Sequence, residues 1–212
     1  METRSAILGR RSIRSFLPQP VGDDVIRDIL DQARWAPSWG NSQAWNVYVL
    51  TGEPLQKVKD EYMRMMREGE ESPTDLEMPS RDVWPPQILA RMNLTRPGET
   101  WSPPPGPSIW EMYGAPCLLV FAIDDGLVEN YECFDAGLLA ENVCLAAYDA
   151  GLGTVIMAMG VRYPDVLREL LPGSGAKRFG VGVALGHPTK DAPVNSIPRE
   201  RADIGEIVTW VR

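Results

Sequence analysis

The stretch AGLLAENVCLAAYDAGLGTVIM, residues 136–157, decides the class of fold. Up to Tyr148 it is apolar around nearly the whole circumference of a helix, and only a deeply buried helix tolerates that pattern. Gly151 stands where a C-terminal helix cap is expected, and the β-branched residues after it predict a strand over 153–159. The sequence therefore predicts a central helix over 129–150, as in the core of a dimer, that leads into a sheet.

Helices and short buried strands alternate along the rest of the chain. Residues 23–36 carry apolar side chains with the 3.6-residue period of an amphipathic helix, which Pro37 ends. This order of elements is typical of α/β and α+β folds. With 212 residues, of which 44% are apolar, the sequence predicts one domain over residues 1–212. The other predicted helices cover 54–69 and 163–171, and the other predicted strands cover 46–50, 115–124 and 178–186.

The charge of the chain limits its partners. A formal net charge of −8 and a pI near 4.8 oppose binding of nucleic acid or of an anionic membrane over the whole surface. No apolar run reaches the roughly 18 to 20 residues of a membrane span, and the N-terminus lacks the apolar core of a signal peptide. The sequence thus predicts a soluble, cytoplasmic protein. His187 is the single histidine and no metal-ligand spacing is present, so no metal site is expected.

Residues 70–112 depart from the alternating pattern. Nine of the 19 prolines lie between Pro73 and Pro107, which excludes regular sheet and a long helix there. Three tryptophans lie in the same segment, and disordered linkers seldom carry several aromatic residues. We therefore expect an ordered excursion that walls a pocket or clasps a partner subunit. The alternative is a solvent-exposed linker.

A cluster of cations lies near the start of this acidic chain. In GRRSIRSF, residues 9–16, Arg10, Arg11 and Arg14 surround Ser12. Guanidinium groups and a hydroxyl suit the oxygens of a phosphate and a neighbouring carbonyl acceptor. The alternative is a solvated face, or internal ion pairs with the many carboxylates of the chain.

A polar loop follows the first predicted helix. In APSWGNSQAW, residues 36–45, polar side chains cluster beside Gly40, where backbone can approach a planar ligand closely. The loop is a candidate ligand-binding edge, and the alternative is an ordinary connection with turn chemistry. The polar side chains are Ser38, Asn41, Ser42 and Gln43.

Together these two stretches resemble the flavin-dependent nitroreductase family, which carries R-R-S-x-R-x-F followed by A-P-S-x-x-N-x-Q-x-W. The resemblance continues in the family's order through GAPCLLVFAID, AGLGTVIM, VALGHP and the closing PRER, and it weakens over residues 60–112. The family is α+β, with a central mixed sheet surrounded by helices. It forms intertwined homodimers and binds one FMN at each of two sites along the dimer interface. The resemblance therefore implies this fold, an FMN cofactor and a homodimer.

The resemblance assigns the arginines of the first motif to the flavin. Arg10, Arg11 and Ser12 would hold the phosphate and the ribityl chain of FMN. Arg14 would reach the pyrimidine edge of the isoalloxazine near N1 and O2. A cation in that position is useful, because reduction places negative charge at N1.

Three further segments are assigned by the same resemblance. Arg199 and Arg201, two apart in an extended segment, would face the same phosphate, although the pair alone is equally consistent with a solvated tail. Trp39 stands where the family often has a small residue, which would narrow the site or stack on an aromatic substrate. The flavin-contacting loop, typically from the second subunit, would be Pro37, Ser38, Trp39, Gly40 and Asn41. The segment that passes the N5 edge with a backbone contact would be Val155, Ile156 and Met157.

The implied activity is that of an FMN-dependent oxidoreductase. NAD(P)H passes hydride to the flavin and leaves, and a nitroaromatic, a quinone or another electron-poor substrate then takes its place in the same cavity. This ping-pong scheme needs no protein nucleophile, so no side chain is assigned as catalytic. The alternatives are a reductive dehalogenase or a flavin-fragmenting relative of the same family, or a non-catalytic FMN-binding protein.

Overall fold

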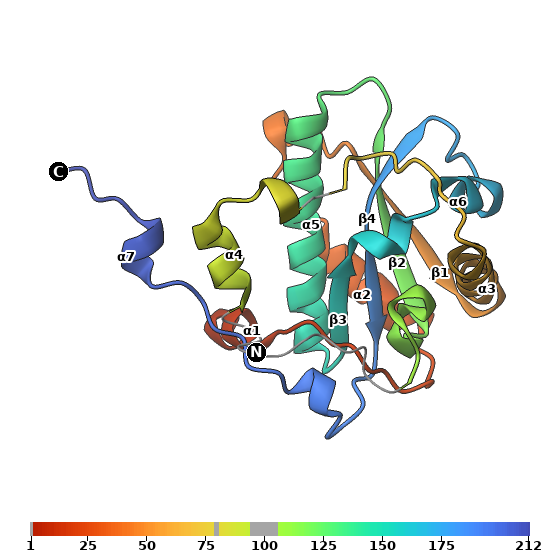
Figure 1. Cartoon of the computed structure of the whole chain (residues 1–212), viewed down its shortest axis with the longest axis horizontal. Helices are drawn as coiled ribbons and strands as arrows, with labels where there is room; N and C mark the ends of the chain where they lie inside the picture. Colours follow the sequence, from red (N-terminus) through yellow and green to blue (C-terminus); the bar gives the residue numbers. More distant parts are fainter. Residues whose placement is uncertain (1, 79–80, 94–105) are drawn as a thin grey trace.

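A four-stranded sheet lies at the centre of the computed structural model, which describes residues 2–78, 81–93 and 106–212 (Figure 1). The sheet has the order β1-β2-β4-β3, so β1 and β3 are its edges. Each of the three strand pairs is antiparallel. The strands are β1 (Trp45–Thr51), β2 (Cys117–Asp124), β3 (Gly153–Met157) and β4 (Lys177–Gly186).

The α+β class, with helices around a central sheet, is confirmed, but the sheet differs from the expected mixed one. The ladders between its four strands are all antiparallel. Among the described residues, the parallel pairing is one isolated bridge between Ser12 and Thr154. A single bridge makes no strand, so the segment at Ser12 runs along the edge of β3 without extending the sheet.

Helices cover both faces of the sheet, and β2 shows why. Its side chains from Cys117 to Ile123 are all buried, and they alternate between two apolar cores. Leu119 packs in the core shared with α2 and α5, whereas Leu118 packs in the core shared with α3 and α6. Burial on both faces accounts for the continuous apolar sequence of this strand. The covering helices are α2 (Asp23–Ala33) and α5 (Glu129–Asp149) on one face, and α3 (Gly52–Glu68) and α6 (Pro164–Leu170) on the other.

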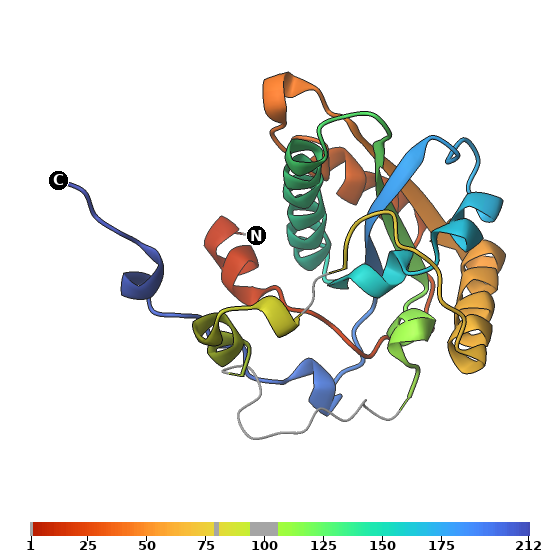
Figure 2. The same cartoon turned by 45° about the horizontal axis from the view of Figure 1, so that its top comes forward.

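The remaining elements are short and lie around the sheet and its covering helices. Figures 1 and 2 both show the C-terminal segment extending away from the rest of the molecule. Across the described ranges, no helix has the length and apolar character that crossing a membrane requires. The short helices are α1 (Thr3–Gly9), α4 (Pro86–Asn93) and α7 (Ile204–Ile207), with 3₁₀ turns at Trp39–Asn41, Arg81–Val83, Ile109–Gly114, Ala158–Val161 and Pro193–Asn195.

Most predicted elements form within two residues of their expected bounds. The helix predicted over 23–36 ends earlier, at Ala33. The strand predicted over 153–159 ends at Met157, because the chain turns there into a 3₁₀ segment that packs on β4. The approach is so close that a Cβ on Gly160 would lie 2.9 Å from the Cα of Gly182.

The described parts of the excursion are tied to the body of the protein. The Asp75 carboxylate accepts a hydrogen bond from Arg168 Nη2 of α6 at 2.6 Å, and one from the Phe179 backbone N–H of β4 at 2.9 Å. Trp110 stacks on Tyr163, with ring centroids 5.9 Å apart. Trp101, which the sequence analysis placed in the excursion, lies outside the described residues.

Candidate functional site

The arginine-bearing segment lies along the open edge of β3. Ile13 donates its N–H to the carbonyl oxygen of Thr154 at 2.9 Å, and its side chain is buried in the core. Gly9 lets the segment approach α5, since a Cβ there would lie only 2.1 Å from the Tyr148 hydroxyl oxygen. These contacts on either side of Arg10 fix the position of its backbone.

The C-terminal segment returns to the same place. Arg199 Nη2 donates to the carbonyl oxygen of Gly9 at 3.0 Å and to that of Leu8. It thereby satisfies carbonyl groups that α1 leaves without intrahelical partners at its C-terminal end. Arg11 donates to the carbonyl oxygen of Ile197. Two basic groups that lie far apart in the sequence thus meet at the end of α1.

Asn195 joins the two segments a few residues further on. Its Oδ1 accepts the backbone N–H of Arg14 at 2.8 Å, and its Nδ2 donates to the carbonyl oxygen of Ser15 at 2.9 Å. The Asn195 side chain is buried, so these hydrogen bonds hold the backbone of Arg14 in a fixed position. The Arg14 guanidinium makes no hydrogen bond or ion pair with the part of the chain that the structure describes.

Four guanidinium groups, Arg10, Arg11, Arg199 and Arg201, form what we call the arginine cluster. The pKa of Arg199 is lowered by its partial burial and then by the positive charges of Arg11, Arg201 and Arg10. Within the described ranges, one carboxylate forms an ion pair with the cluster: Glu141 Oε1 of α5 accepts from Arg10 Nε at 2.7 Å. The cluster therefore keeps an excess of positive charge, which favours an anion.

The edge of β3 offers a backbone donor beside these arginines. In a strand, the N–H and C=O of one residue point to the same side, and consecutive residues alternate. The carbonyl oxygen of Thr154 points away from β4, because it accepts from Ile13. The N–H of Ile156, two residues later, therefore faces the same open edge, and its side chain is 42% exposed. The backbone N–H and C=O groups of Val155 and Met157 face β4, and the side chains of these two residues are buried.

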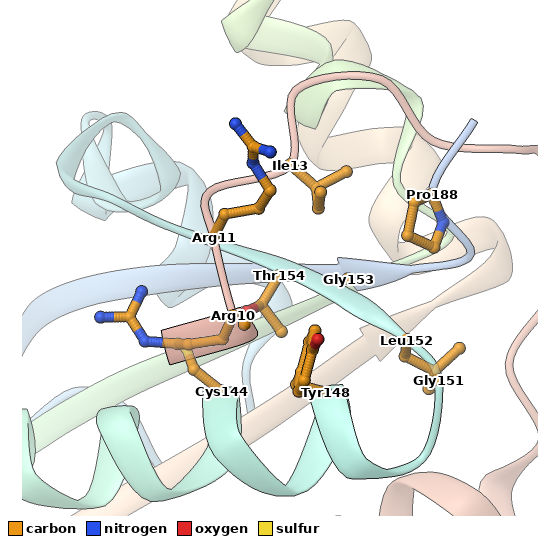
Figure 3. A pocket seen from close by; sticks show the side chains of 11 residues that line it. Arg10, Arg11, Ile13, Cys144, Tyr148, Gly151, Leu152, Gly153, Thr154 and Pro188 are labelled. Carbon is orange, nitrogen blue, oxygen red and sulfur yellow. The ribbon is translucent and has the colours of Figure 1, made fainter. Parts of the chain in front are cut away.

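A cavity of about 170 Å³ lies between the arginine-bearing segment, β3 and the C-terminal part of α5. Figure 3 shows the guanidinium groups of Arg10 and Arg11 directed to different sides, with the Tyr148 ring rising from α5. Burial raises the pKa of the Cys144 thiol, which also lines this cavity, to about 11. The thiol therefore stays protonated at neutral pH and offers no nucleophile.

The polar loop is fixed by its own backbone and by α5. The N–H of Trp39 donates to Asp135 Oδ2 at 2.8 Å, and the Asp135 carboxylate is only 3% exposed. The N–H of Gln43 donates to Ser38 Oγ at 3.0 Å. The left-handed φ angles that close the loop are 56° at Gly40, 59° at Asn41 and 50° at Gln43.

The polar loop and the first half of α5 expose large apolar side chains. Trp39, Tyr131 and Phe134 are 69%, 58% and 65% exposed and form what we call the aromatic patch. With Pro37 and Leu138 they line a hollow of about 480 Å³. Exposed aromatic groups gathered in one place are typical of a surface that binds another molecule.

Within one chain, the polar loop and the arginine cluster contact different parts of α5. The loop is bonded to Asp135, whereas Arg10 is bonded to Glu141 and Gly9 lies against Tyr148. At 1.5 Å per residue, Asp135 lies about 9 Å from Glu141 and about 20 Å from Tyr148 along the helix. Figure 1 shows α1 beside the lower end of α5 and the orange segment between α2 and β1 at its upper end.

The Nitroreductase family profile matches residues 7–187. The chain belongs to this family. A similar curated protein is the 4-nitrobenzoate reductase of Pseudomonas putida, 28% identical over 219 residues that cover 93% of this chain and 91% of that protein. Another is the nitrobenzene nitroreductase of Ectopseudomonas oleovorans, 27% identical over 217 residues that cover 97% and 95% of the two chains.

Solved structures of nitroreductases have the same fold as this chain. The FMN and NADPH-dependent nitroreductase NfnB from Sphigopyxis sp. strain HMH superimposes with a TM-score of 0.85, covering 100% of both chains at 24% identity. NfnB from Mycobacterium smegmatis, solved in complex with NADPH, gives a TM-score of 0.83 at 21% identity, covering 99% of this chain and 97% of that one.

In this member of the nitroreductase family, the predicted site residues fall into two groups. The structure brings the first motif, Ile156 and the C-terminal pair together at the open edge of β3: Arg10, Arg11, Ser12, Arg14, Ile156, Arg199 and Arg201. It does not bring the loop residues to them within one chain: Pro37, Ser38, Trp39, Gly40 and Asn41. Val155 and Met157 were expected to line the flavin with Ile156, but their backbone groups face β4 and their side chains are buried.

Sequence reasoning missed the residues that hold these groups in place. Asn195, Glu141 and Asp135 carry hydrogen bonds that fix Arg14, Arg10 and Trp39. Asp135 and Glu141 are charged residues within a largely apolar stretch of helix, and their charge was a signal for a polar partner. Asn195 gave no such signal, because an asparagine near prolines is ordinary in a loop.

Proposed function

We propose that this chain is an FMN-dependent oxidoreductase that uses NAD(P)H to reduce nitroaromatic, quinone or related electron-poor substrates. The observation that carries the proposal is the meeting of Arg10, Arg11, Arg199 and Arg201 beside the open edge of β3, in a chain of the nitroreductase family. The relatives named above act on nitrobenzoate and nitrobenzene, and two of the similar structures are named as FMN-dependent.

The residues present fit FMN. The arginine cluster has one described carboxylate partner for four cations, which suits a dianionic terminal phosphate. Arg14 keeps its guanidinium without a described partner, at a backbone position that Asn195 holds. The N–H of Ile156 faces the same open edge as a donor. These groups would hold the phosphate, the pyrimidine edge and the N5 side of the flavin respectively.

Bound FMN would supply the redox chemistry, accepting hydride from NAD(P)H and passing it to the second substrate by a ping-pong mechanism. The residues of the chain would bind the flavin, orient it and adjust its reduction potential. Arg14 would hold positive charge next to the atom where reduction places negative charge, and this favours acceptance of hydride. Ile156 would fix the ring by its backbone N–H. We assign no side chain as catalytic, and Cys144 stays protonated at neutral pH.

We further propose that the site is completed by a second copy of the chain. Within one chain the polar loop is bonded to Asp135, about 9 Å along α5 from the Glu141 that pairs with the arginine cluster, and the aromatic patch beside the loop is exposed. A homodimer in which the loop of one copy approaches the arginine cluster of the other would use both features. We propose that residues 1–212 form one domain of this dimer and that the protein works in the cytoplasm.

The purified protein tests the proposal directly. It should be yellow, release FMN on denaturation, and oxidise NADH or NADPH when nitrobenzene or a quinone is added. Recovery of FAD, or no flavin binding after incubation with FMN, would contradict the cofactor assignment. Bound FMN without NAD(P)H oxidation would instead identify a non-catalytic binding protein. Deiodination of an iodotyrosine, or loss of the flavin itself during turnover, would identify the dehalogenase or flavin-fragmenting alternative.

A further inference from the structure

We propose that Glu141 is the counter-ion of the arginine cluster and that its negative charge limits how tightly the site holds the phosphate of its ligand. The inference rests on the proposed function and concerns one residue that no motif of the sequence singled out. Glu141 would orient Arg10 and repel the phosphate through its charge, and it would not itself touch the flavin. It is therefore a positioning residue.

The geometry places this carboxylate among cations. Glu141 Oε1 accepts from Arg10 Nε at 2.7 Å, and Arg10 acts electrostatically on Arg199 together with Arg11 and Arg201. Nε is the inner nitrogen of the guanidinium, so the ion pair leaves both terminal nitrogens of Arg10 able to donate elsewhere. A phosphate bound by those nitrogens would lie on the opposite side of the same guanidinium from Glu141.

Neighbouring contacts hold Arg10 within reach of Glu141. Glu141, Cys144 and Tyr148 are three and four residues apart on α5, so they lie on one face of the helix. All of that face meets the start of the arginine-bearing segment: Cys144 and Tyr148 line the same cavity as Arg10, and Gly9 lies against Tyr148. The ion pair is thus part of a fixed contact between α5 and the site.

Two consequences follow from a carboxylate in this position. Without a phosphate, Glu141 offsets part of the repulsion among the four cations. With a phosphate bound, the same carboxylate repels it across one guanidinium. Replacing Glu141 by glutamine removes the charge and keeps an oxygen that can accept from Arg10 Nε, so it separates the charge from the orientation of Arg10.

The test compares FMN with riboflavin, which lacks the phosphate, by equilibrium dialysis against the full-length protein. Because the Glu141 side chain is partly exposed, we expect Glu141→Gln to bind FMN about three- to tenfold more tightly than wild type. Riboflavin affinity should not change, and the gain for FMN should shrink at high salt. Unchanged or weaker FMN binding, or an equal shift for riboflavin, would overturn the proposal.

A matched control and a second variant complete the design. Glu129→Gln removes the same charge from the same helix, where Glu129 pairs with Arg178 about 18 Å from Glu141 along the axis. It should leave FMN affinity as in wild type. Arg10→Ala should weaken FMN binding, and adding Glu141→Gln should restore part of that loss; no restoration would overturn the proposal. If wild type binds neither flavin, the proposed function itself fails, which is a different result.

Discussion

The arginine cluster and the polar loop are built in opposite ways. The arginine cluster is assembled from distant parts of one chain, by hydrogen bonds such as those from Arg199 to Leu8 and Gly9. The polar loop is a local structure, closed by its own positive φ angles and held to the chain by Asp135. Its apolar neighbours remain exposed. The arginine cluster is nearly complete within one chain. The polar loop is folded within one chain, but the surface beside it lacks a binding partner there.

The largest expected effect comes from disrupting the surface beside the polar loop. Phe134→Arg places a charge in the aromatic patch, whose burial we expect in the homodimer. The variant should become monomeric and lose nearly all turnover, because the loop of the second copy no longer reaches the arginine cluster. Light scattering and steady-state NAD(P)H oxidation measure the two effects.

The control for this variant is Glu169→Arg, which adds the same side chain at an exposed position of α6 on the other face of the sheet. It should remain dimeric and active. A folded Phe134→Arg monomer that still turns over would show that one chain suffices for activity. The polar loop of a second copy would then not be needed at the arginine cluster.

The second prediction concerns the region assembled within one chain. Arg199→Ala removes charge-assisted hydrogen bonds worth about 1.5 to 3 kcal/mol each, so FMN should bind about tenfold to hundredfold more weakly. Riboflavin affinity should fall much less, because it has no phosphate. Arg67→Ala, an exposed arginine on α3, is the matched control and should change neither value. Equal losses for FMN and riboflavin would mean that Arg199 only fastens the end of α1.

These regions also show what can be predicted from the sequence. The order of the four strands and of the helices α2, α3, α5 and α6 followed from apolar periodicity and from glycine and proline positions, because such patterns are local. The doubly buried strand β2 is one example, with its continuous apolar run. The pairing of Arg10 with Glu141, 131 positions away, leaves no local pattern. The resemblance implied that the polar loop reaches the flavin from the second subunit, but no local pattern in the sequence showed that the loop and the arginine cluster contact different parts of α5.

A smaller effect should follow from tightening the contact that positions Arg10. Gly9→Ala places a Cβ 2.1 Å from the Tyr148 hydroxyl oxygen, and the rearrangement should cost about 1 to 3 kcal/mol of unfolding free energy. Thermal unfolding measures it. In a Tyr148→Ala background the obstacle is gone, so Gly9→Ala should cost much less there. An equal cost in both backgrounds would show that the loss arises from the backbone of Gly9 and not from Tyr148.

The smallest expected effect distinguishes two arginines of the same motif, and it depends on their different partners. Arg11 donates to Ile197, in the segment that brings Arg199 to the site, whereas the Arg14 guanidinium has no partner among the described residues. Arg11→Ala should therefore weaken FMN retention and leave the reduction potential of the bound flavin unchanged. Arg14→Ala should lower that potential by some tens of millivolts, since about 30 mV corresponds to about 1.4 kcal/mol for a two-electron couple. Spectroelectrochemical titration of both loaded variants measures the shift. If Arg11→Ala moves the potential and Arg14→Ala does not, the two roles are reversed; if neither variant changes potential or retention, the motif is a solvated face.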